Sequence, residues 1–184
     1  MPPTPDGHLE EKILRAASRL WRTRGESGLT LRAVARAAGT TTPTLYKRFR
    51  NKEALRTALA FRFRDEMNAE IYSVQTVEQV YRGYLSYAET KPHEFNLMRI
   101  SLEKFLSPQS PQPGRTWFLS RMRERFGGTA EEYGRVFNAI FLMCTGAAAV
   151  LSTAGDPEVR DAVRKNCLDA CDEVMQNVEI FRAK

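Results

Sequence analysis

The chain has 184 residues, of which 42% are hydrophobic and 27% charged, enough for one ordinary folded domain or two small ones and too apolar for intrinsic disorder. No apolar run reaches the roughly 18 residues that a membrane span needs, and the N-terminus lacks the basic and then apolar order of a signal peptide, so we expect a cytoplasmic chain with no membrane partner. The 28 Lys and Arg residues outnumber the 22 Asp and Glu residues and give a net charge of +6.

Apolar residues recur with helical spacing along the chain, and the alternation typical of strands is almost absent, which predicts an all-α fold. The first helix is expected over about 9–24 and should stop at Gly25, with residues 25–28 as a turn. Thr30 can cap a short second helix by accepting a backbone N–H bond, and Gly39 breaks that helix.

A third helix is expected directly after this break. Residues 40–42 are threonines that offer N-cap hydroxyls, and Pro43 fits the first turn, where a missing N–H is tolerated. The helix should continue over 44–49 with Leu45 and Phe49 facing inward. The first third of the chain therefore reads as a helix, a tight glycine turn and a second helix.

The rest of the chain also follows helical periodicity. Helices are expected over about 51–72, 77–91, 93–106, 117–126, 136–151 and 159–181. The segment 107–114 has three prolines in eight residues and predicts a loop.

The last two expected helices carry more apolar surface than a small domain can cover. In 136–151 only Asn138 and Thr145 are clearly polar, and a helix that is apolar on all sides must be buried on all sides. We therefore expect a homodimer whose interface resembles a four-helix bundle, with the small residues 146–149 and Val174 at the seam.

The three cysteines do not predict a disulfide framework, because their number is odd and the chain is large enough to fold without one. Cys167 and Cys171 are four apart on one expected helix, and this single pair does not make a zinc site. Two stacked core cysteines is the favoured interpretation, and a thiol-sensing or metal-sensing regulator that uses Cys144, Cys167 and Cys171 is the alternative. We expect no metal and no cofactor.

An enzyme is the least favoured class of function. His8 and His93 are far apart in the sequence, and the acidic residues are scattered. No catalytic triad, Cys-His pair, paired carboxylates or metal-ligand set can be assembled from them.

Positive charge is concentrated in the first third of the chain. Residues 1–64 hold 14 Lys and Arg against 5 Asp and Glu, a net charge of +9, whereas residues 65–184 hold 14 against 17, a net charge of −3. Neutralisation of phosphates with release of counterions is a common source of affinity for nucleic acids, so the first third is suited to a polyanion. A solvated basic face is equally compatible with this composition.

The run TLRAVARAAGTTTPTLYKRFRNKEAL, residues 30–55, resembles the DNA-binding signature of the tetracycline-repressor (TetR/AcrR-like) family of bacterial transcriptional regulators. It has the Ala-Gly turn, a Thr-Leu-Tyr core in the second helix of the pair, a Phe three residues after that Tyr, and Asn-Lys-Glu opening the next helix. Many relatives have Val-Ser at Thr40 and Thr41, so a hydroxyl is kept at the second position. The resemblance is specific over about 9–64 and looser beyond.

The resemblance assigns roles to single residues. A helix fits the major groove, where base edges differ in their donors, acceptors and methyl groups. The side chains from Thr42 to Thr44 and Lys47 are expected to approach bases, and Tyr46 to reach a phosphate. Lys52 is expected to bind a phosphate together with the N–H groups at its helix start. The full expected DNA-binding set is Thr30, Arg32, Thr41, Thr42, Pro43, Thr44, Tyr46, Lys47, Arg48 and Lys52. In the simpler interpretation, Thr41 or Thr42 only caps the helix.

The resemblance also implies an organisation and a function. A three-helix helix-turn-helix DNA-binding domain is expected over 1–52, the helix over about 51–72 connects, and a larger helical domain for ligand binding and dimerisation is expected over 53–184. The implied function is a homodimeric regulator, most often a repressor in this family, that leaves a palindromic double-stranded DNA operator when a small apolar or aromatic inducer binds.

Aromatic and Met side chains of the second part suit the lining of an apolar cavity. The expected ligand-binding set is Tyr84, Tyr87, Phe95, Met98, Phe105, Trp117, Phe118, Phe137 and Phe141. Ordinary core packing is the alternative for each of them, and the resemblance alone places a cavity there.

Overall fold

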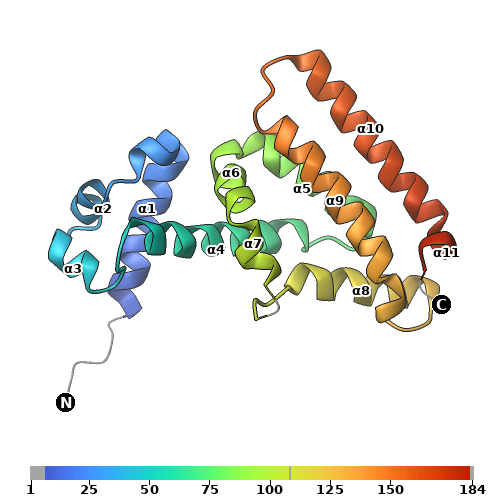
Figure 1. Cartoon of the computed structure of the whole chain (residues 1–184), viewed down its shortest axis with the longest axis horizontal. Helices are drawn as coiled ribbons and strands as arrows, with labels where there is room; N and C mark the ends of the chain where they lie inside the picture. Colours follow the sequence, from blue (N-terminus) through green and yellow to red (C-terminus); the bar gives the residue numbers. More distant parts are fainter. Residues whose placement is uncertain (1–6, 108, 183–184) are drawn as a thin grey trace. The chain divides into compact units, whose positions relative to one another are not determined.

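The computed structural model describes residues 7–107 and 109–182, and within them every regular element is a helix, as the periodicity predicted (Figure 1). The chain divides into two compact units, Met1–Arg64 and Asp65–Lys184. The boundary between them falls inside α4 (Lys52–Ile71). The expected boundary at 52/53 lies at the start of this same helix.

The first unit contains α1 (Gly7–Gly28), α2 (Leu31–Ala37), α3 (Thr42–Tyr46) and the first part of α4. α1 packs on α2, and α2 packs on α3. Arg62 on α4 binds Glu11 on α1, with 2.8 Å between the nitrogen and the oxygen. The core includes six side chains with no exposed surface: Ile13, Ala17, Val34, Leu45, Leu55 and Leu59.

α1 runs on to Gly28 instead of stopping at Gly25. Gly25 has φ 56° and ψ −142°, so the expected stop is present as a kink inside one longer helix. At Gly28 an added Cβ would lie 2.6 Å from the carbonyl oxygen of Leu20. The chain can close this last turn tightly because no side chain stands there.

α3 is shorter than expected and ends at Tyr46. The next residues form turns, and the N–H of Phe49 donates to the carbonyl of Leu45 at 2.9 Å. Leu45 and Phe49 are both buried, as predicted, with 0% and 5% of their surface exposed.

The second unit holds the end of α4 and the remaining helices. These are α5 (Val77–Thr90), α6 (Pro92–Ile100), α7 (Leu102–Leu106), α8 (Pro113–Phe126), the 3-10 helix η1 (Glu131–Tyr133), α9 (Gly134–Leu151), α10 (Pro157–Gln176) and α11 (Val178–Phe181). Two helices that the sequence predicted as continuous are each divided in two. The first divides at Ser101, with φ −103° and ψ 7°, and the second at Asn177, with φ −109° and ψ 34°.

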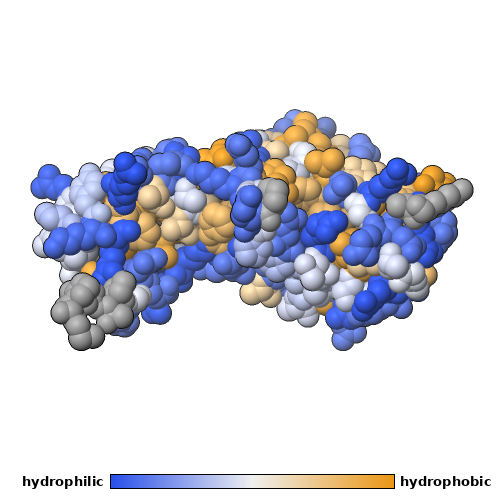
Figure 2. Space-filling view, turned by 60° about the horizontal axis from the view of Figure 1, so that its bottom comes forward, coloured by the Kyte–Doolittle hydropathy of each residue, from blue (hydrophilic) through white to orange (hydrophobic). Residues whose placement is uncertain are grey.

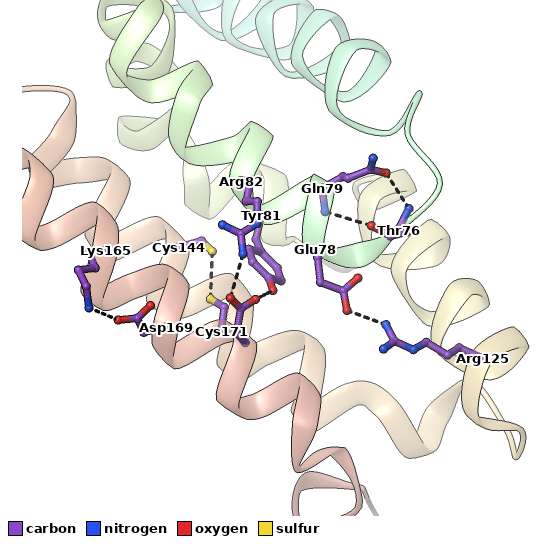
Figure 3. Close-up of polar contacts among 11 residues, drawn as sticks. Thr76, Glu78, Gln79, Tyr81, Arg82, Arg125, Cys144, Lys165, Asp169 and Cys171 are labelled. Carbon is purple, nitrogen blue, oxygen red and sulfur yellow. Dashed lines mark hydrogen bonds and ion pairs between the residues drawn. The ribbon is translucent and has the colours of Figure 1, made fainter.

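α5, α9 and α10 pack against one another and form the centre of this unit, and Figure 1 shows α9 and α10 running side by side. α5 begins with a capping box, in which the Thr76 hydroxyl accepts the N–H of Gln79 at 3.3 Å and the Gln79 side chain accepts the N–H of Thr76 at 3.2 Å (Figure 3).

One helical segment in the described residues, Glu131–Leu151, is long and apolar enough to cross a membrane by length and composition alone. Core helices of soluble proteins pass the same test. α9 buries one face, which carries Val136, Ile140, Cys144 and Ala148, within this unit. Only 28% of the apolar window is buried in the single chain, so much of this helix reaches the surface of the unit.

Candidate nucleic-acid interface

α3 presents one side to solvent because its other side is anchored by Leu45 and the adjoining Phe49. Pro43, Tyr46 and Lys47 are exposed, and half of the Tyr46 surface is accessible, 50%. Thr42, Thr44 and Arg48 are half-buried beside them. The structure therefore brings the expected base-reading residues together on one short helix and its turn.

Thr41 is the N-cap of α3, which decides between the two threonines that the sequence left open. Its hydroxyl accepts the N–H of Thr44 at 3.3 Å and lies 2.8 Å from the Thr44 hydroxyl. Thr30 acts in the same way at α2, where its hydroxyl accepts the N–H of Ala33 at 3.1 Å. Both oxygens therefore fix helix starts, whatever else they contact.

Lys52 stands at the start of α4, whose cap is Asn51, as predicted. The side-chain oxygen of Asn51 accepts the N–H of Ala54 at 2.8 Å. The Lys52 nitrogen lies 3.9 Å from a carboxylate oxygen of Glu26, and Arg56 holds the same oxygen at 3.1 Å. Sequence reasoning missed Glu26, because it lies in the stretch interpreted as a turn.

The segment that carries this surface has positively charged residues and no negatively charged ones. Residues 27–52 contain six Lys or Arg residues and no Asp or Glu. Arg32 is exposed on the first turn of α2, and Arg36 and Arg50 are also exposed. A surface of this charge attracts polyanions without any dependence on sequence.

The expected ligand-binding residues pack in the second unit as two aromatic groups and several single core side chains. Tyr84 meets Phe95 edge-on at 5.7 Å, and Phe137 lies 5.4 Å from Phe118 and 5.6 Å from Phe141, measured between ring centres. Tyr87, Met98 and Phe105 are buried, and Trp117 is half-buried.

Two polar side chains, Thr145 and Tyr72, lie beside these rings and were not in the expected set. The Thr145 hydroxyl is 3.5 Å from the Tyr84 hydroxyl, and burial raises the pKa of Tyr84 to about 12. Tyr72 packs its ring 5.2 Å from that of Trp117, and burial raises its pKa as well. Thr145 carried a signal in the sequence, since it is one of two polar residues in an otherwise apolar helix.

An open surface hollow of about 640 Å³ runs along α8. Of the nine expected ligand-binding residues, Trp117 is the one that lines it. The lining residues are Pro111, Gln112, Pro113, Thr116, Trp117, Ser120, Arg121 and Glu124.

The three cysteines converge, although the sequence pointed only to the pair on α10. Cys144 on α9 has its sulfur 3.7 Å from that of Cys171 (Figure 3). All three sulfurs lie within 4.8 Å of one another. All three side chains are buried, with 3%, 8% and 0% exposed for Cys144, Cys167 and Cys171. The hydrogen bonds to Cys167 and Cys171, with burial, raise the pKa of the Cys144 thiol.

Comparisons with known sequences agree with the motif in the first unit. Residues 13–59 match the family model described as bacterial regulatory proteins, tetR family. Two uncharacterized HTH-type transcriptional regulators, from two strains of Mycobacterium tuberculosis, are each 39% identical to this chain over 61 residues. The matched region covers 33% of this chain and 30% of each relative.

Comparisons with solved structures extend over both units. A TetR transcriptional regulator from Streptomyces coelicolor superposes with a TM-score of 0.69 at 20% identity, over 95% of this chain and 99% of that one. A TetR variant from Acinetobacter baumannii in complex with minocycline has a TM-score of 0.66 at 18% identity, over 99% of this chain and 100% of that one. At these identities the likeness shows a shared fold.

Proposed function

We propose that the chain is a regulator of the TetR family, whose family model matches residues 13–59, and that it acts as a DNA-binding transcriptional repressor. In this proposal a dimer acts in the cytoplasm, binds a palindromic operator, and leaves it when a small apolar ligand binds the second unit. Its role is binding and not catalysis.

The exposed side of α3 is the observation that carries the proposal. Lys47 is exposed, Thr44 is half-buried beside it, and Leu45 between them faces the core, so both side chains can reach base edges when α3 enters a major groove. Tyr46 and Lys52 are the proposed phosphate contacts, which fix the register of the protein on the duplex.

A selection from randomised operators tests this assignment. Thr44→Ala and Lys47→Ala should each relax the base preference at a few operator positions, at a cost of roughly 1–3 kcal/mol where a good base contact is lost. Lys104→Ala is the matched control, since Lys104 is an exposed lysine on α7, outside the first unit and outside α9 and α10. If both α3 variants keep the base preferences of the wild type, α3 is not the element that reads the operator sequence.

The free faces of α9 and α10 support the proposed dimer. Leu142 and Val150 on α9 are 66% and 40% exposed, and Val159 on α10 is 44% exposed. An added Cβ at Gly146, on the same face of α9, would meet nothing within 4 Å, so a second backbone can approach closely there. In Figure 2, patches of hydrophobic residues, in orange, are exposed on the surface among the hydrophilic residues, in blue.

The position of Val174 has to be revised within this proposal. The sequence placed it at the seam, but only 7% of its surface is exposed, because it packs inside its own unit. The seam is therefore assigned to the exposed residues of α9 and α10 around Leu142.

A ligand-binding role for the second unit rests on the family and on its aromatic side chains with polar tips, such as Tyr84 beside Thr145. An inducer should stabilise the free protein by about 2.7 kcal/mol at a hundredfold excess over its dissociation constant. It should also weaken operator binding, by the same factor by which the operator weakens inducer binding. A thermal-shift screen of apolar compounds, repeated with operator present, measures both effects. If the compounds that stabilise the protein have no effect on DNA binding, the proposed release from the operator by an inducer is wrong.

A further inference from the structure

We propose that Cys144, Cys167 and Cys171 form a three-sulfur site for a thiophilic trivalent ion of the arsenite class. The inference does not depend on the proposed function, because it concerns binding to the free protein.

The positions of the sulfurs come from two helices. Cys167 and Cys171 are one helical turn apart, so they face the same way from α10. Cys144 reaches them from α9, which packs along α10. Both helices lie in the centre of the second unit, so the three sulfurs are held by well-packed neighbours.

The spacing suits a single central ion. An ion of the arsenite class carries a lone pair and binds three sulfurs as a pyramid, so bonds of about 2.3 Å at angles of about 95° place the sulfurs roughly 3.4 Å apart. The sulfurs of Cys144 and Cys171 are 3.7 Å apart, and all three lie within 4.8 Å of one another. Small side-chain rotations therefore bring all three within bonding distance of one ion.

The number of ligands argues against a zinc site. Structural zinc takes four ligands in a tetrahedron. Among the residues that the structure describes, no His, Asp or Glu ligand atom joins the three sulfurs. Asp172, next to Cys171, already accepts a hydrogen bond from the Tyr81 hydroxyl and binds Arg82, with 2.8 Å between the Arg82 nitrogen and the Asp172 oxygen.

Charge selects a trivalent ion. Three thiolates around a trivalent ion are neutral, whereas a divalent ion leaves one negative charge and a monovalent ion leaves two. A net charge in a buried site is costly unless a counterion is present. Two neighbouring cations are already engaged, Arg82 with Asp172 and Lys165 with Asp169.

The chemistry needs no oxidant and no change of net charge. Arsenite enters as neutral As(OH)3. Each thiol forms an As–S bond, the matching As–O bond breaks, and the thiol proton leaves with the hydroxide as water. Three thiols and one As(OH)3 thus give one As(S–Cys)3 and three water molecules. Cys167, with 8% of its surface exposed, is the natural first ligand.

The product would join α9 to α10 by covalent bonds. A ligand that binds only the folded chain stabilises it by mass action. We therefore expect arsenite to raise the melting temperature of the reduced full-length chain, with one arsenic bound per chain and three protons lost in the intact mass.

The test titrates sodium arsenite into the reduced full-length chain under exclusion of oxygen and compares it with three single variants, Cys144→Ser, Cys167→Ser and Cys171→Ser. Changes to outer groups of metal sites alone alter affinity by about 10- to 100-fold, so the loss of a sulfur ligand should weaken binding by more than about 100-fold. Circular dichroism and melting without arsenite verify that each variant folds, and Cys144→Ala replaces Cys144→Ser if the hydroxyl disturbs the core.

Two outcomes would overturn the inference. Unchanged arsenite affinity in a folded Cys144 variant would show that the α10 pair binds alone. Tighter binding of zinc than of arsenite by the wild-type chain would exclude the trivalent ion. Operator binding without arsenite is measured in parallel, so failure of this site and failure of the proposed function are distinguishable.

Discussion

Lys52 and Arg56 share the carboxylate of Glu26 unequally, since Lys52 lies at 3.9 Å and Arg56 at 3.1 Å. A pair as long and exposed as that of Lys52 contributes little to stability. We therefore expect Lys52→Ala to leave the fold intact while weakening binding to all DNA sequences alike. The slope of log K against log[salt] should fall by about 1, because one phosphate contact is lost.

Fluorescence anisotropy with operator and with unrelated DNA at several salt concentrations measures this effect. Lys104→Ala, which removes an exposed lysine of α7, should change neither the slope nor the affinity. An unaltered slope for Lys52→Ala would contradict its phosphate role.

Glu132 carries a pH dependence that its contacts explain. The N–H of Thr129 and the guanidinium of Arg182 hold the pKa of Glu132 below its ordinary value of 4.5. A carboxyl group whose pKa is lower in the folded state adds stability above its unfolded pKa, and this stability is lost as the pH falls through the folded pKa. Glu132→Gln should therefore lower the melting temperature near neutral pH and flatten its decline below about pH 4.5.

Melting curves from about pH 3 to pH 7 test this, with Glu103→Gln, an exposed glutamate of α7, as the control. A decline at acid pH as steep in Glu132→Gln as in the wild type would show that other carboxyl groups carry it.

At the scale of elements, the sequence predicted helices wherever local signals are strong. α4 begins after Asn51 as its cap, and α5 ends before Pro92, where the missing N–H cannot continue a helix. The breaks at Ser101 and Asn177 lack such a signal, since neither is a glycine or a proline. Their positions depend on packing against other helices, which the local sequence does not contain.

The same distinction holds for the sites. The outward residues of α3 were predictable, because burial of Leu45 fixes which side of a helix faces solvent. Glu26 beside Lys52, and Cys144 beside the α10 pair, were not, because each comes from a different helix. Contacts between elements require the fold, whereas the face of one element follows from its period.

Gly39 makes the turn between α2 and α3, and its φ of 61° lies in the left-handed region. An added Cβ would meet only the Lys12 nitrogen, at 3.6 Å, so the cost of Gly39→Ala is in the backbone and not in a clash. We expect Gly39→Ala to destabilise the first unit by about 1–2 kcal/mol. Gly39→Asn should cost less, because Asn tolerates this conformation.

Denaturant unfolding of both variants, with DNA binding measured alongside, gives the comparison. Equal loss of stability in Gly39→Ala and Gly39→Asn would point to a steric cause instead of a conformational one.

At the scale of the whole molecule, the dimer is the part of the proposal that a single chain leaves incomplete. A two-fold dimer presents two reading helices, and it should favour pseudo-palindromic half-sites about one helical turn, ~34–36 Å, apart. Leu142, 66% exposed on α9, is the most exposed large side chain of the assigned seam. We expect Leu142→Glu to give a monomer and to abolish tight operator binding, because it buries a charge in the interface.

Two further variants make the result specific to the seam. Leu106→Glu changes a comparably exposed leucine, 47%, on α7 and should leave both the dimer and operator binding unchanged. Val174→Glu places a charge in the core of the unit and should lower the melting temperature of the fold itself. Sedimentation velocity at micromolar concentration separates loss of the dimer from loss of the fold. A wild-type protein that sediments as a monomer without DNA would contradict a pre-formed dimer, and the exposed face of α9 would then need another partner.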